Sequence, residues 1–138
     1  MKLKLIPILF VLLSCNNNTS NSSNSDVESY EEEKNNVENY ENNSPVSFLK
    51  LNYSTHKNLI GEIVINGEIE NTAKVATYKD IEVQVDFYSK TNTLLSSQTE
   101  TIYEYIEASK TSSFKFKLDC PTDTERVNCS IVNAKESQ

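Results

Sequence analysis

Two cysteines near the carboxyl end of the 138-residue chain, Cys120 and Cys129, have a spacing that suits a disulfide bond. Apolar and polar residues alternate through 114–120 and through 127–131, as in strands with one buried face. The alternation places both sulfurs on that face. We predict that a hairpin through the segment PTDTERVN brings Cys120 and Cys129 within bridging distance. Two buried thiols that pack as small hydrophobic side chains are the alternative.

The other reactive side chains form no recognisable catalytic or metal-binding set. No nucleophile motif accompanies His56, the single histidine, and we expect it on the surface in a loop. Asp119, Asp123 and Glu125 do not have the spacing of a calcium loop, so a solvated acidic turn is expected. Neither a phosphate-binding Gly-rich loop nor a basic face with interleaved aromatics is present. We therefore predict a protein that is not an enzyme and has no cofactor, metal or nucleic-acid partner.

Two tyrosines in the segment TIYEYIE could contact a ligand. Tyr103 and Tyr105 share one face of the expected strand, and Ile102 and Ile106 share the other. If the isoleucines are buried, the tyrosines are exposed together and can stack on a sugar or contact a protein. A strand near the sheet edge, half-buried on both sides, is the alternative.

Cys15 stands where an apolar run ends and a wholly polar segment begins. The run, residues 5–13, follows a basic start and precedes the small Ser14, which is the layout of a secretory signal. At 1.5 Å per residue this stretch spans about 14 Å, too little to cross a hydrocarbon core of about 30 Å. We expect residues 1–14 to be a cleaved signal peptide.

The segment Leu12-Leu13-Ser14-Cys15 resembles the lipobox of bacterial lipoproteins. That resemblance implies cleavage before Cys15 and attachment of a diacylglycerol to its sulfur. Two or more acyl chains hold a protein stably on a membrane, whereas one chain binds it only marginally. A plain signal peptide with an incidental cysteine is the alternative. Asn16, in place of an aspartate, favours outer-membrane delivery under the familiar sorting rule.

Residues 15–44 contain the lipid-bearing Cys15 and an acidic tether rich in Asn, Ser and Glu. With one Lys against one Asp and six Glu, the tether holds most of the net charge of −7. Because it has almost nothing to bury, we predict that it is disordered. The five-residue segment at 27–31 nearly recurs at 37–41, both reading Val-Glu-x-Tyr-Glu. A doubled partner motif is one interpretation, and low-complexity drift or a weakly helical stretch is the other.

Residues 45–138 have the size of one small domain and the period-two pattern of strands. One expected strand covers 46–53, and another covers 94–106 and is long enough to bend or divide. The apolar faces of four further strands are Ile63/Ile65/Gly67/Ile69, Ile81/Val83/Val85/Phe87, Phe114/Phe116/Leu118 and Val127/Cys129/Ile131. Strands with one polar face must bury the other against a second sheet. We predict an all-β, immunoglobulin-like antiparallel sandwich of six to seven strands, without an internal helix.

The stretch GEIVINGEIENTAKVATYKDIEVQVDFYSKTNTLLSSQ resembles the FxLYD domain of bacterial secreted proteins and lipoproteins. Gly67, Ile69 and Asn71 match one strand end of that family, and Tyr88 matches the tyrosine of its name-giving motif. Ser89 replaces the family's aspartate. The resemblance covers about 58–118 and implies an immunoglobulin-like sandwich, with no established catalytic or ligand residues.

Together these features predict a monomeric cell-envelope lipoprotein, anchored to a membrane outside the cytoplasm through Cys15. Its sandwich would contact another envelope protein. The alternative is a carbohydrate-binding lipoprotein that uses Tyr103 and Tyr105.

Overall fold

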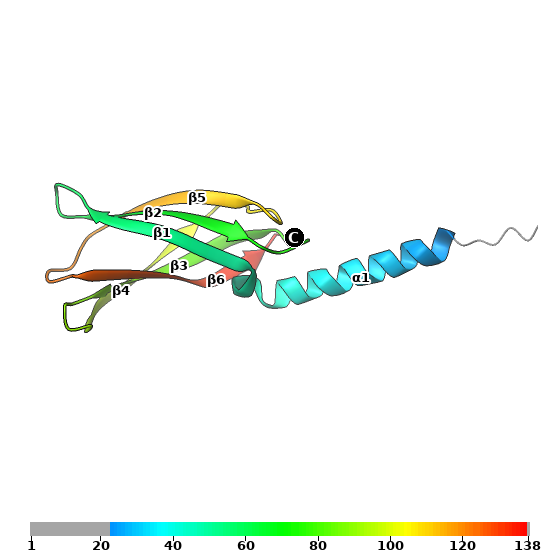
Figure 1. The fold of residues 1–138 in the computed structure, drawn as a ribbon, viewed down its shortest axis with the longest axis horizontal. Coiled ribbons are helices and arrows are strands. Elements are labelled where there is room, and N and C mark those ends of the chain that lie inside the picture. Colours follow the sequence, from blue (N-terminus) through cyan, green and yellow to red (C-terminus); the bar gives the residue numbers. More distant parts are fainter. Residues whose placement is uncertain (1–22, 138) are drawn as a thin grey trace, which may run out of the picture.

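The computed structural model describes residues 23–137, which form one helix and a β-sandwich. The helix, α1, covers Ser23–Asn43 and leaves one end of the sandwich close to its long axis (Figure 1). The other elements are η1 (Pro45–Phe48), β1 (Leu49–Lys57), β2 (Ile63–Asn71), β3 (Tyr78–Tyr88), β4 (Leu94–Ile102), β5 (Thr111–Leu118) and β6 (Arg126–Glu136). The expected signal segment, Cys15 and the start of the tether lie outside the described residues.

The strands form two antiparallel three-stranded sheets, ordered β1-β2-β5 and β4-β3-β6. The hairpins β1–β2 and β3–β4 each stay within one sheet, whereas the chain changes sheets after β2, β4 and β5. The resulting neighbours, β2 with β5 and β3 with β6, are the pairings of an immunoglobulin-like sandwich. The predicted all-β sandwich of six to seven strands is therefore confirmed.

The core lies between the sheets and consists of the inward-facing residues that the alternation predicts. Tyr78 and Phe87 are its largest fully buried side chains. The other fully buried apolar residues with the largest volumes are Ile65, Ile69, Ile81, Ile106, Val83 and Val85. Burying a large apolar side chain contributes roughly 1.5–3 kcal/mol, so this layer is the main source of the sandwich's stability.

The structure differs from the sequence expectations at three segments. Residues 23–43, expected to be disordered, form α1. The first strand begins at Leu49, because Pro45–Phe48 takes a 3-10 conformation with proline in its first turn. The strand expected over 94–106 ends at Ile102, and Ile106 forms only an isolated bridge to Tyr78.

Most helix side chains that the structure describes are exposed, so burial of the helix cannot explain it. It has no basic residue in its last turn, where a cation would complement the helix dipole. Its carboxyl end is instead fixed by the sandwich, as described below. No helix in the described part of the chain is long and apolar enough to cross a membrane.

Candidate interaction site at the helix junction

Glu41, in the last turn of α1, fastens the helix to the loop between β2 and β3. Its carboxylate accepts hydrogen bonds from three consecutive backbone N–H groups, at 2.7 Å from Lys74, 3.0 Å from Val75 and 2.9 Å from Ala76. Only 2% of Glu41 is exposed. Burial raises the pKa of this carboxyl, but the three N–H donors and the charge of Lys74 outweigh it, and the pKa is lowered below 4.5.

The loop is held in shape by the buried side chain of Asn71 at the end of β2. Asn71 Nδ2 donates to the carbonyls of Ala76 and Ile106, both at 2.9 Å. Asn71 Oδ1 accepts from the backbone N–H of Ala73, also at 2.9 Å. These bonds curve the chain so that the next three N–H groups point at Glu41. A buried amide with its partners satisfied is a rigid element, so the loop is preorganised for the carboxylate.

Two further hydrogen bonds and an aromatic contact complete the junction. The hydroxyl of Tyr78 donates to the backbone carbonyl of Glu41 at 3.0 Å, which satisfies one of the free carbonyls at the helix end. Burial, and then the charges of Glu41 and Glu136, raise the pKa of Tyr78 to about 12. Asn42 Nδ2 donates to Glu136 at 2.6 Å, and Tyr40 packs edge-on against Phe48 with ring centroids 5.7 Å apart.

Two hollows lie along α1 beside this junction and together form what we call the junction groove. One, of about 210 Å³, is lined by Tyr30, Glu33, Lys34, Val37, Lys74 and Val75. The other, of about 370 Å³, is lined by Asn36, Val37, Tyr40, Glu41, Phe48 and Lys74. Val37 and Lys74 line both hollows, so they adjoin. The groove presents aromatic and aliphatic side chains, with Lys34 on the helix side and Lys74 on the loop side.

The near-repeat of the tether supplies the helical wall of this groove. Val27, Tyr30, Val37 and Tyr40 fall on one face of α1 at 100° per residue, and all four are exposed. The fifth residue of the second copy is Glu41, which binds the loop, whereas the fifth residue of the first copy, Glu31, is exposed. The sequence pattern did not single out Glu41. Its position in the second copy of the repeat, directly before the domain, could have indicated a contact with the domain.

Tyr103 and Tyr105 are exposed, by 79% and 64%. Ile102 and Ile106 beside them are buried. Both tyrosines follow the end of β4 and therefore lie in the β4–β5 connection rather than on a strand. The ammonium of Lys79 lies 5.7 Å from the centre of the Tyr105 ring, a cation–π distance.

The predicted disulfide is absent, and Cys120 and Cys129 are free thiols. The hairpin on which that prediction depended does not form, because β5 pairs with β2 and β6 pairs with β3. Burial, and then the charge of Asp86, raise the pKa of the Cys129 thiol to about 11. Cys120 and Cys129 pack at the core as small hydrophobic side chains, which is the alternative interpretation.

His56 is exposed as expected but lies on β1 opposite Val64 rather than in a loop. Asp119, Asp123 and Glu125 are exposed residues of the β5–β6 connection. Within residues 23–137, no group of three or more His, Cys, Asp or Glu side chains is arranged to hold a metal ion.

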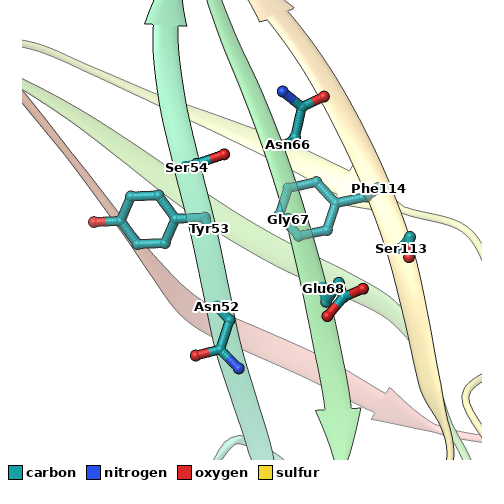
Figure 2. Close-up of a pocket in the computed structure, with 8 residues that line it drawn as sticks. All are labelled: Asn52, Tyr53, Ser54, Asn66, Gly67, Glu68, Ser113 and Phe114. Carbon is teal, nitrogen blue, oxygen red and sulfur yellow. The ribbon is translucent and has the colours of Figure 1, made fainter.

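A hollow of about 450 Å³ opens on the sheet of β1, β2 and β5 (Figure 2). It lies over Gly67, where the missing side chain leaves room for the ring of Phe114 on the neighbouring strand. The side chains of Asn52, Ser54, Asn66 and Ser113 bring hydrogen-bonding groups to the hollow, and Tyr53 and Phe114 bring aromatic rings. It is an open depression of the sheet surface, unlike the clefts that enclose small ligands.

Comparisons with known proteins give no relative for this chain: no family model, curated protein or solved structure matches it.

Proposed function

We propose that the protein is a cell-envelope lipoprotein, anchored outside the cytoplasm by a lipid on Cys15, which presents its β-sandwich to another envelope protein. The signal-like start and the lipobox-like segment support the anchor. The resemblance of residues 58–118 to the FxLYD domain supports a non-enzymatic module.

The observation that carries the proposal is the fastening of α1 by Glu41. A helix of 21 residues is about 31 Å long. Because its carboxyl end is fixed to the sandwich, α1 acts as a spacer between the expected anchor and the domain. The same fastening creates the junction groove, whose aromatic and aliphatic side chains suit a protein contact.

The anchor is tested in cells with Cys15→Ser. The unchanged chain should take up an alkyne fatty acid and remain in the membrane fraction, and the variant should do neither. A variant that still sediments with membranes would contradict the lipid anchor. Separation of inner and outer membranes then tests the localisation that Asn16 favours.

The protein contact is tested by placing a photo-crosslinking amino acid at Tyr40 in the groove and, as a control, at Thr99 on the exposed face of β4. We expect one discrete adduct from position 40 in living cells, none from position 99, and loss of the adduct when Glu41→Gln is added. Equal labelling from both positions would contradict a contact at the groove.

A second candidate function uses the exposed pair Tyr103 and Tyr105, whose ring faces can stack on sugars. A glycan array with the unchanged chain and the Tyr103→Ala/Tyr105→Ala variant tests it. Binding that survives the double substitution would remove the basis of this candidate.

A further inference from the structure

The most exposed large hydrophobic residues of the described chain stand together at the turn between β1 and β2. Leu59 is fully exposed, at 107% of its reference area, and Ile60 is 80% exposed. Figure 1 shows this turn at the end of the sandwich opposite α1. Isolated exposed hydrophobics are common, but two adjacent ones on a convex tip indicate a contact surface.

The turn that carries them is rigid. Asn58 Oδ1 accepts hydrogen bonds from the N–H groups of Ile60, at 3.1 Å, and of Glu62, at 2.9 Å. The backbone adds bonds from the Asn58 N–H to the Glu62 carbonyl and from the Gly61 N–H to the Asn58 carbonyl. Gly61 has φ +92°, which a residue without a side chain adopts readily. The backbone that carries the two apolar side chains is thus held in one conformation.

The same hydrogen bonds determine whether the turn can enter a non-polar environment. Four of the five N–H groups of residues 58–62 are hydrogen-bonded inside the turn. Asn58 Nδ2 donates to the carboxylate of Glu62 at 2.7 Å, so the polar side chains at the base are paired with each other. Hydrocarbon offers no hydrogen bonds, and each unpaired group taken into it costs several kcal/mol. A turn that satisfies its own backbone avoids most of that cost.

Three lysines behind the tip can contact a phospholipid surface. Lys57 adjoins the turn, and the register places Lys117 opposite Val64 and Lys115 opposite Asn66, on the neighbouring strand. All three lysines are exposed, and none takes part in an ion pair within residues 23–137. The carboxylates at this end of the sandwich are Glu62, which binds Asn58, and the exposed Asp119, Asp123 and Glu125 of the β5–β6 connection. Lysine side chains beside an inserted apolar tip can reach lipid phosphates.

We propose that the β1–β2 turn is a lipid-contact site, at which Leu59 and Ile60 enter the interfacial region of a phospholipid bilayer. A convex tip needs no cavity in its partner, and its internally bonded backbone favours lipid over the polar groups of a protein pocket. This site is separate from the lipid on Cys15 and does not depend on it.

The test uses the chain from Asn16 to Gln138, which lacks the expected signal and Cys15 but keeps every residue of the fold described above. Vesicles of phosphatidylcholine with a quarter phosphatidylglycerol, and of phosphatidylcholine alone, are titrated in sedimentation assays. We expect weak binding that is stronger on the anionic vesicles. The Leu59→Ser/Ile60→Ser variant should lose about tenfold or more, equivalent to about 1.4 kcal/mol. Circular dichroism checks that the variant is folded.

The absence of tryptophan from the chain provides a second readout. The single tryptophan of Ile60→Trp should shift its emission to the blue on vesicles and be quenched by brominated lipid. A tryptophan at another exposed aromatic site, Tyr103→Trp, is the matched control and should show neither effect. Equal binding by the serine variant, or equal responses at positions 60 and 103, would overturn the assignment. No binding to either vesicle, with an unshifted emission of the tryptophan at position 60, would also overturn it. The turn would then be a contact for the pocket of a partner protein.

Discussion

The carboxylate of Glu41 accepts a hydrogen bond at 2.9 Å from the backbone N–H of Ala76, a residue 35 positions further along the chain. With the bonds from Lys74 and Val75, this contact joins the helix to the sandwich. The orientation of α1 and the existence of the junction groove both depend on it.

Replacing this carboxylate should release the helix without unfolding the sandwich. In Glu41→Gln an amide replaces the charged acceptor, and hydrogen bonds to charged groups contribute about 1.5–3 kcal/mol each. We expect faster hydrogen exchange at the N–H groups of Lys74, Val75 and Ala76 and greater mobility of a spin label on α1. The matched control is Glu31→Gln, at the same place in the first copy of the repeat. Equal effects of the two substitutions would mean that Glu41 does not fasten the helix.

The junction should also weaken in acid. The pKa of Glu41 is lowered in the folded protein, so the folded state favours its charged form. Its contribution to stability is therefore present above the ordinary value of 4.5 and is lost as the pH falls through the lowered pKa. Hydrogen exchange at the β2–β3 loop, corrected for intrinsic rates between pH 3 and 7, should show this loss. The Glu41→Gln variant should lack that component, and an unchanged pH profile would contradict the assignment.

A side chain at position 67 should destabilise the first sheet. A Cβ at Gly67 would lie 2.5 Å from Phe114 Cε1 and 3.1 Å from the backbone oxygen of Asn52, closer than van der Waals contact allows. Gly67→Ala should cost about 1–3 kcal/mol in urea unfolding, the range for overpacked cores. The same change in a Phe114→Leu background should cost less, because the ring is gone. Additive costs would show that Phe114 is not the obstacle.

Thiol chemistry should distinguish the two cysteines of the sandwich. In the chain from Asn16 to Gln138, two thiols should react under denaturing conditions without prior reduction. In the folded protein at pH 8 Cys129 should react much more slowly than Cys120, because its pKa is raised to about 11 and it is buried. Mass mapping after timed alkylation assigns each site. Finding no reactive thiol before reduction would mean that a disulfide forms in solution.

Much of the fold could be predicted from the sequence because strand burial repeats every two residues. The alternation Ile81, Val83, Val85 and Phe87 identified a core strand before any pairing was known, and all four side chains are fully buried. Alternation does not account for Tyr103 and Tyr105, because both lie in the β4–β5 connection, beyond the end of β4 at Ile102.

The candidate site could not be predicted in this way. Glu41 lies in a segment whose composition indicates disorder, and its three partners are backbone groups, which any sequence has. Only the curve of the β2–β3 loop, fixed by Asn71, directs those groups toward it. The lipobox-like segment and the lipid on Cys15 stay predictions, as does the likeness to the FxLYD domain.

The sequence alone determined where strands form and which of their faces are buried, because both depend on neighbouring residues in one chain segment. The tertiary structure decided which strands pair. Cys120 and Cys129 illustrate the difference: local alternation placed both toward the core, but the pairing of β5 with β2 removed the hairpin that would join them. The helix was decided at the same level, since α1 leaves its apolar side chains exposed and is fixed by groups that only the folded sandwich brings to Glu41.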